Sequence, residues 1–199
     1  MTSGLRERKK AATRHRLHGA ALRLVAARGL DAVSVDDIAE AADVSPRTFF
    51  NYFPTKDDAV IGLDPSGPDD LAEAFAARPA DEAPVDSLRA VLRSRAAEMA
   101  VDTDIWSLRL PVIDGNPVLG ARMAAHFTAT ENALAAAIAA RTGGTAGVDV
   151  YPSLLAAVQG VVMRVSLHRW LTGGFGRALP ELVDEAWDVI VAGLPAPHA

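Results

Sequence analysis

The segment from Ser34 to Lys56 constrains the fold of this chain more than any other part of it. Asp37 follows Ser34 by three residues, and this spacing lets a serine and an acid cap the free backbone amides at the start of a helix. Ser45 is a second candidate N-cap, and Pro46 suits the first position of the next helix because its missing N–H costs nothing there. Two short helices separated by a tight turn form a helix-turn-helix, so we expect one here.

The apolar residues of this segment fall where a helix-turn-helix needs them. Ala39 is small where the two helices cross, and Val44 is an apolar residue that can anchor the turn in the core. Ile38, Phe49 and Phe53 can pack the unit against the preceding helix. The second helix, which we expect to end near Phe53, then presents an outer face able to meet base edges and phosphates. This face carries Arg47, Thr48, Asn51 and Tyr52.

Charge is divided unevenly along the chain. Up to Lys56 there are ten basic and six acidic residues, a net charge of +4, whereas the remainder carries −9. A basic N-terminal segment on an acidic body indicates a polyanionic partner for that segment, although the same cluster also fits a solubilising tail. Next to a helix-turn-helix, we expect the basic residues between positions 6 and 16 to neutralise phosphates or to reach a minor groove.

The pattern of the remaining residues predicts an all-α fold. No period-two alternation of useful length occurs, and alanine, the strongest helix former, dominates the composition. Residues 104–113 are an apolar run that fits a helix or a strand, and the helical context favours a helix. The two prolines and the glycine between Leu63 and Pro68 predict a break. Outside the helix-turn-helix, we expect helices over residues 6–28, from Thr55 to the break, and over residues 69–77, 85–101, 104–113, 117–143, 153–171 and 179–194.

Over residues 14–60 this sequence resembles the TetR family of regulators. The matching elements are Ser34, the pair Ile38-Ala39, the turn Val44-Ser45, the run Phe49-Phe50-Asn51-Tyr52-Phe53, and Lys56. The resemblance implies a three-helix DNA-binding domain over residues 1–60 and a helical ligand-binding and dimerisation domain over residues 69–199. An unrelated helical bundle with a chance helix-turn-helix is the alternative. The residues that we expect at the DNA are Arg8, Lys9, Lys10, Arg14, Ser34, Val35, Ser45, Arg47, Thr48, Asn51, Tyr52 and Lys56.

The resemblance implies a repressor that binds double-stranded operator DNA as a homodimer and is released by a small hydrophobic or acyl-type effector. The sequence departs from the family pattern in three places. Phe50 stands where the family often has a tyrosine whose hydroxyl touches a phosphate, and Tyr52 stands at the usual histidine, where its hydroxyl can take over that contact. The break from Asp64 to Pro68 interrupts the helix that usually connects the ligand core to the DNA-binding head.

The two helices expected nearest the C-terminus are apolar over much of their circumference. Helices of this kind need more than one neighbour. In TetR-like proteins the last two helices of each subunit form a four-helix bundle at the dimer interface, while the alternative is that both helices are only the core of one subunit. The residues that we expect at the interface are Val158, Val161, Val165, Trp170, Val183, Trp187 and Ile190.

The middle helices are expected to enclose an effector pocket. Methionines and aromatic residues suit adaptable apolar sites, although they equally suit an ordinary core. Arg109 and Arg164 would give the pocket a basic point, which favours an acyl chain with an anionic head. The motifs at 108–111 and 168–171 are loosely similar to regulators that bind acyl-CoA-like ligands. The residues that we expect at the ligand are Met99, Trp106, Arg109, Leu110, Ile113, Met123, His126, Phe127, Met163 and Arg164.

Other functional classes lack their characteristic residues. The chain has no cysteine, and His15 and His18 have no acid or cysteine beside them at ligand spacing, so we expect no metal. An enzyme, such as a small helical hydrolase or a lipid-handling protein, would need a nucleophile–base pair or a cofactor motif, and we find neither. A purely structural dimer leaves the recognition helix unexplained. With no run of eighteen apolar residues and no signal peptide, we expect a cytoplasmic protein without a cofactor.

Overall fold

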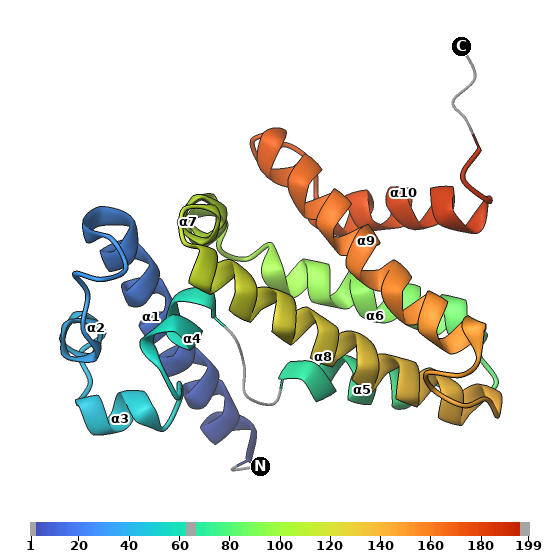
Figure 1. Ribbon diagram of the computed structural model, residues 1–199, viewed down its shortest axis with the longest axis horizontal. Coiled ribbons are helices and arrows are strands. Elements are labelled where there is room, and N and C mark those ends of the chain that lie inside the picture. The colour runs from blue at the N-terminus through green and yellow to red at the C-terminus, as the bar shows by residue number, and fades with distance from the viewer. Residues whose placement is uncertain (1–2, 63–66, 196–199) are drawn as a thin grey trace. The chain divides into compact units, whose positions relative to one another are not determined.

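The computed structural model describes residues 3–62 and 67–195 (Figure 1). All regular elements in these two ranges are helices, so the all-α fold expected from the sequence is confirmed. The chain separates into two compact units. In chain order the helices are α1 (Ser3–Arg28), α2 (Val35–Ala41), α3 (Pro46–Phe50), α4 (Lys56–Ile61), α5 (Gly67–Ala76), α6 (Pro84–Met99), α7 (Thr103–Asp114), α8 (Pro117–Thr142), α9 (Val150–Thr172) and α10 (Leu179–Val191).

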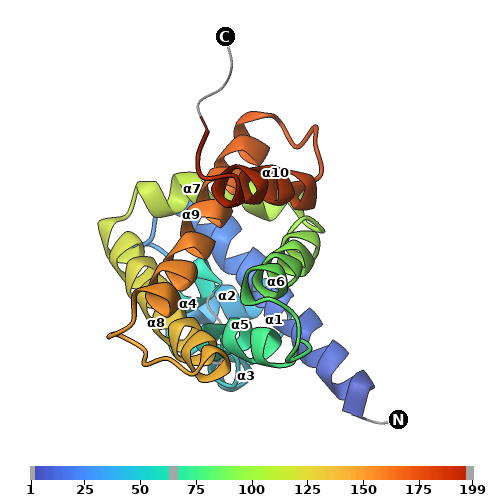
Figure 2. The same cartoon turned by 90° about the vertical axis from the view of Figure 1, so that its right-hand side faces the viewer.

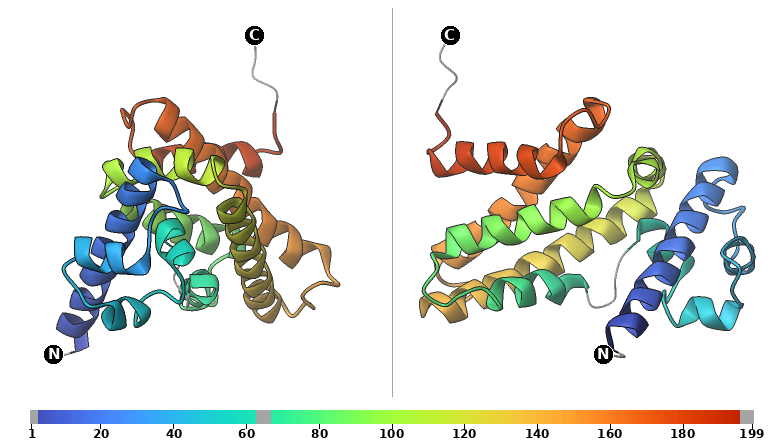
Figure 3. Two further views of the ribbon diagram at one scale, coloured as in Figure 1. Left: turned by 60° about the vertical axis from the view of Figure 1, so that its left-hand side comes forward. Right: turned by 180° about the vertical axis from the view of Figure 1, so that it is seen from behind.

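The first unit contains α1 to α4 together with residues 104–126. Helix α1 packs against both α2 and α4, and α3 follows α2 (Figures 1 and 3). These short helices start where the sequence predicts, because Ser34, Ser45 and Thr55 each accept a hydrogen bond from a backbone amide three residues later. At α2 the capping box is complete, since the Asp37 carboxylate also accepts from the backbone amide of Ser34 at 2.8 Å.

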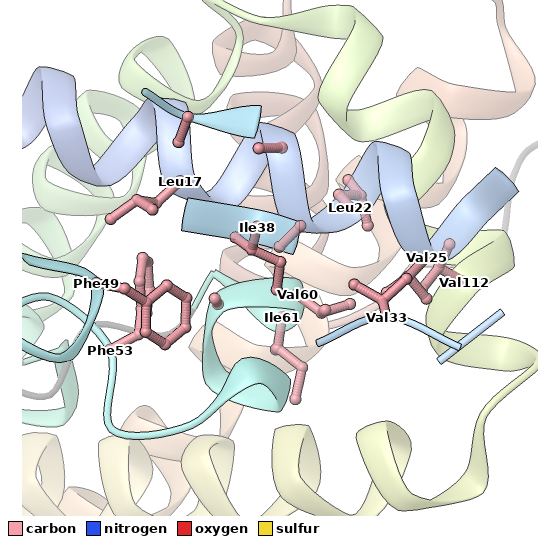
Figure 4. Packing of buried hydrophobic residues seen from close by; sticks show 14 of the residues in the cluster. Leu17, Leu22, Val25, Val33, Ile38, Phe49, Phe53, Val60, Ile61 and Val112 are labelled. Atoms are coloured by element: carbon pink, nitrogen blue, oxygen red, sulfur yellow. The ribbon is translucent and has the colours of Figure 1, made fainter. Parts of the chain in front are cut away.

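The core of the first unit is built from large side chains contributed by every helix of the helix-turn-helix (Figure 4). Leu17 on α1, Ile38 on α2 and Phe49 on α3 are fully buried. Figure 4 shows the rings of Phe49 and Phe53 beside one another, and their centroids are 6.0 Å apart. Burying a side chain of this size contributes about 1.5–3 kcal/mol. This packing fixes α3 in the shared core and thereby determines which α3 residues face solvent.

Helix α7 and the first turns of α8 also belong to this first unit. The ambiguous run at 104–113 is helical, and Ile105, Ile113 and Leu119 are buried in the same cluster as the helix-turn-helix residues. Residues 104–126, which fall within the second domain expected at 69–199, thus group with the N-terminal core. Periodicity identifies the apolar face of a helix but not the core that the helix joins.

The second unit contains α5, α6, residues 127–142 of α8, α9 and α10. Helix α10 packs against α6 and α9 (Figures 1 and 2), and Trp187 is buried within this unit. The Arg89 guanidinium of α6 reaches two carboxylates of α10, Asp184 at 2.9 Å and Asp188 at 2.7 Å. Apolar burial and these ion pairs together hold α10 on α6.

Within the described residues, α9 is the one helix whose length and composition would suffice to cross a membrane. One such helix does not by itself indicate a membrane span, because a helix in the core of a globular unit can have the same length and composition. Helix α9 packs against α6 and α10, with Val162 and Trp170 buried. We therefore assign α9 to the core of the second unit.

Two helix ends differ from the sequence expectation. Helix α3 ends at Phe50 rather than near Phe53, because the amides of the next residues bond back to the Phe49 and Thr48 carbonyls in tight turns. Helix α4 ends at Ile61, and Gly62 caps it in the left-handed region at φ +74°. Most of the break expected from 63 to 68 lies outside the described residues.

Candidate nucleic-acid interface

Helix α3 begins at a tightly fixed N-terminus. The Ser45 hydroxyl accepts a hydrogen bond from the backbone amide of Thr48 at 3.1 Å and lies 2.9 Å from the Thr48 hydroxyl. Pro46 occupies the first turn, where no amide is needed. Both hydroxyls are therefore engaged within the protein, although Ser45 itself remains exposed. Their principal observed role is to orient the start of the recognition helix.

The outer face of α3, together with its C-cap residue Asn51, carries three exposed side chains able to contact DNA. Arg47, Phe50 and Asn51 are exposed, whereas Phe49 is fully buried. Arg47 and Asn51 were expected on this face from the sequence, but Phe50 was considered only for the hydroxyl that it lacks. The sequence does indicate that Phe50 is exposed. Phe49 and Phe53 are four residues apart and therefore share the buried face, which leaves Phe50 outside that face.

Tyr52 and Arg14, both expected at the DNA, are engaged in holding the recognition segment to α1. Tyr52 is half-buried and packs against the core. The Arg14 guanidinium donates to the Tyr52 carbonyl at 3.0 Å and lies 4.4 Å from the centre of the Phe53 ring. This contact spans 38 residues of sequence and fixes the end of the turn that follows α3.

Lys56, the last residue of the family-like pattern, is turned toward the protein. Its ammonium group donates to the backbone carbonyls of Leu30 at 2.7 Å and Val33 at 2.9 Å. These carbonyls belong to the connection between α1 and α2, where they have no helical partner. Lys56 therefore ties the start of α4 to the α1–α2 turn, and two of its three protons are already in use.

The remaining candidates at the DNA differ in their surroundings. Ser34 is exposed, but its hydroxyl donates to Asp37, and hydrogen bonds from Ser34 hold the pKa of the Asp37 carboxyl below its usual value. Val35 is half-buried. Lys9 and Lys10 are exposed on α1, while the side chain of Arg8 lies outside the described residues.

His18 lies between α1 and α4. Its Nδ1 is 2.7 Å from the Ala59 carbonyl, and its ring packs so closely on Gly62 that a Cβ there would come within 2.8 Å of it. Burial, with a smaller contribution from the nearby Arg109 guanidinium, lowers the pKa of His18 to about 4. His18 is therefore neutral at pH 7 and donates its ring proton to the Ala59 carbonyl.

Arg109 on α7 is half-buried with its Nε in the interior, and the described residues show no acidic partner for it. Its Nε is buried and forms no hydrogen bond, and its guanidinium lies 4.6 Å from the centre of the Trp106 ring. Burial lowers the pKa of Arg109 to about 10. Burying a charge without a counter-charge is costly, so this position favours an anion.

The other effector candidates fall into two sets. In the first unit, Trp106 and Ile113 are buried, and Leu110, Met123 and His126 are half-buried. In the second unit, Met99 and Met163 are half-buried and Phe127 and Arg164 are exposed. None of the ten lines the hollow of about 250 Å³ that lies between α5 and α6. That hollow is lined by Asp70, Leu71, Ala74, Arg78, Ala90, Val91, Ser94, Arg95 and Glu98.

The residues expected at the dimer interface also differ in exposure. Val161 and Val165 on α9 are exposed, and Val158 and Ile190 are half-buried. The other three have their side chains in the core of this same subunit, namely Trp170, Val183 and Trp187. Leu154, at 60% exposure, lies on the same side of α9 as Val158 and Val165 and adds to the exposed apolar set.

Comparison with known proteins places this geometry in a family. Residues 18–60 match the model described as bacterial regulatory proteins of the tetR family, and residues 82–195 match the model of the MftR C-terminal domain. The chain belongs to the TetR family. Its DNA-binding and C-terminal parts are thus both those of a TetR-family transcriptional regulator.

Two relatives and one solved structure illustrate the relationship of this TetR-family regulator to others. The HTH-type transcriptional regulator TcmR of Streptomyces glaucescens is 37% identical over 175 residues, which cover 84% of this chain and 76% of TcmR. MftR of Mycobacterium tuberculosis, described as a mycofactocin biosynthesis transcriptional regulator, is 32% identical over 196 residues, 94% of this chain and 93% of MftR. FadR of Bacillus subtilis, solved with stearoyl-CoA, shares the fold with a TM-score of 0.59 at 19% identity, covering 91% of this chain and 99% of FadR.

Proposed function

We propose that this TetR-family regulator is a cytoplasmic repressor that binds a palindromic operator as a homodimer. The observation that carries the proposal is the outer face of α3, where Arg47, Phe50 and Asn51 are exposed to solvent. The helix that presents them is capped at its N-terminus by Ser45 and anchored in the core by Phe49. Such a face needs little reordering to bind, which favours affinity. A dimer would place two α3 helices about 34–36 Å apart, in successive major grooves.

An operator titration tests the DNA-binding surface. The probe is the DNA upstream of the gene for this chain, and the variants are Arg47→Ala and the matched control Arg95→Ala on α6 of the second unit. If Arg47 contacts a guanine edge, its loss costs about 1–3 kcal/mol of operator affinity, while Arg95→Ala binds like the wild type. Equal operator affinity of the two variants would show that α3 is not the recognition surface.

The homodimer is supported by an apolar stripe on α9. Leu154, Val158, Val161 and Val165 recur at three- and four-residue steps, and three of them are exposed. An exposed contiguous apolar face of this kind marks a protein–protein contact. In the proposal these residues and Ile190 meet the partner subunit, whereas the buried Trp170, Val183 and Trp187 support the interface from within the subunit core.

Arg109 supports the proposal that the effector is an anion. A ligand carboxylate or phosphate beside the guanidinium would supply the counter-charge that the described residues do not. The presence of stearoyl-CoA in the B. subtilis FadR structure makes an acyl-CoA the first ligand to test. Apolar candidates of the same unit as Arg109, such as Leu110, Ile113 and Met123, would then contact the acyl chain, and the unbranched side chain of Met123 suits an adaptable site.

Ligand titrations test the effector. The wild type and Arg109→Met are titrated with stearoyl-CoA, stearate and uncharged stearyl alcohol, with thermal stability and operator affinity as readouts. We expect the two anions to stabilise the wild type and to release DNA with a coupling of about 1–3 kcal/mol. Arg109→Met should lose the preference for anions and be more stable without ligand, because an uncompensated buried charge has been removed. Equal binding of the alcohol and the anions by the wild type would contradict an anionic effector.

A further inference from the structure

Phe50 is an apolar ring that the protein itself does not cover. It is 57% exposed, whereas Phe49 and Phe53, its neighbours in the same aromatic run, are fully buried. Arg47 precedes Phe50 by one helical turn and Asn51 follows it, so the ring stands among the side chains able to meet base edges. A phenyl ring placed in solvent at the centre of a binding face is a candidate contact rather than a core residue.

The orientation of the Phe50 ring is supported from below. Its edge-to-face contact with Phe49 has a centroid separation of 5.4 Å and an interplanar angle of 87°. Phe49 is fully buried, so it provides a fixed support. A phenyl ring has no hydroxyl and cannot hydrogen-bond a phosphate. The partner of Phe50 on the DNA must therefore be an apolar group.

In the major groove, the C5-methyl of thymine is the apolar group that a base edge presents. We propose that Phe50 reads a thymine methyl in each operator half-site and that the same contact accepts the methyl of 5-methylcytosine. The inference rests on the proposed function, because it requires α3 to lie in the major groove. In this proposal Phe50 determines which base is preferred at one position of each half-site, while Arg47 and Asn51 contribute hydrogen bonds at neighbouring positions.

The size of the effect follows from the area of one methyl group. Burying a methyl or methylene group contributes about 0.8 kcal/mol, which corresponds to about fourfold in affinity for one half-site. A symmetric dimer uses two half-sites, so removing the methyl from both should weaken operator binding by about 15-fold. The phosphate contacts are unchanged by this substitution, so the salt dependence of binding should stay the same.

Replacing thymine by deoxyuridine tests the inference, because it removes the methyl and leaves the base pairing intact. Each thymine of the operator is replaced in both half-sites, one position at a time. We expect one position at which the wild type loses about 15-fold and Phe50→Ala binds thymine and uracil equally. Tyr151→Ala is the matched control, since that ring is 49% exposed on α9, and it should discriminate like the wild type. At the same position the wild type should prefer 5-methylcytosine to cytosine, and Phe50→Ala should not.

The outcomes separate this inference from the proposed function. A wild-type protein that binds the operator but does not distinguish thymine from uracil at any position overturns the role of Phe50 alone. Discrimination that persists in Phe50→Ala also overturns it, because another group must then contact the methyl. A wild-type protein that binds no operator overturns both. Non-specific DNA affinity at low salt verifies that Phe50→Ala is folded, since that affinity depends on phosphate contacts.

Discussion

Replacing Lys56 by methionine distinguishes a structural lysine from a phosphate-binding one. The ammonium group of Lys56 makes two hydrogen bonds, to the carbonyls of Leu30 and Val33, and the methionine keeps the length of the side chain while removing both. A hydrogen bond from a charged donor contributes about 1.5–3 kcal/mol. Because Lys56 is half-buried and water can replace part of the interaction, we expect Lys56→Met to lower the free energy of unfolding by about 2 kcal/mol.

Two measurements are needed, and Lys9→Met is the matched control. Urea unfolding gives the free energy of unfolding, and operator titration over a range of salt concentrations gives the slope of log K against log salt. Lys56→Met should unfold earlier with little change in that slope. Lys9 is exposed on α1, so Lys9→Met should keep its stability and, because the homodimer loses two lysines, reduce the slope by about 1.8 if each Lys9 contacts a phosphate. A reduced slope with unchanged stability in Lys56→Met would refute the structural role.

Two further predictions concern pH and assembly. The pKa of His18 is lowered to about 4, so the folded state binds a proton at this residue less readily than the unfolded state does. The stability that neutral His18 provides is therefore present above about pH 6.5 and is lost as the pH falls toward 4. Urea unfolding should show that the free energy of unfolding of the wild type falls by about 2 kcal/mol between about pH 7 and about pH 5. His18→Gln should flatten this pH dependence, and a wild type equally stable at about pH 7 and about pH 5 would contradict the prediction. Val165→Arg should yield folded monomers with weakened operator binding, because the charge falls on the exposed α9 stripe, whereas Trp187→Arg should unfold the second unit by burying a charge. Sedimentation and circular dichroism separate these results, and a fully dimeric Val165→Arg would move the interface elsewhere.

The parts of the fold that depend on near neighbours in sequence could be predicted. Ser34, Ser45 and Thr55 cap their helices through amides three residues away, so a short segment contains all of the necessary information. The burial of Phe49 and Phe53 follows from their four-residue spacing. The family resemblance rests on the same local pattern, and the family assignment is confirmed.

The roles of several charged residues could not be predicted, because their partners lie far away in sequence. Lys56 bonds to carbonyls 23 and 26 residues away, and Arg14 to a carbonyl 38 residues away. A basic residue beside a recognition helix looks the same in the sequence whether it faces phosphate or its own backbone. The burial of Arg109 without a counter-charge likewise depends on how α7 packs, which no periodicity reveals.

Helix α8 contributes to two cores, and this limits how regulators of this kind can be recombined. Residues 117–126 pack with the DNA-binding unit and residues 127–142 with the other, within one uninterrupted helix. A fragment cut after Gly62 would leave the cluster without Ile105, Ile113 and Leu119, and would expose the surface that they cover. A chimera that exchanges DNA-binding heads therefore needs three crossovers rather than one, with the last inside α8. Redesign of operator specificity on this scaffold is better achieved by changing the face of α3 than by transplanting a head.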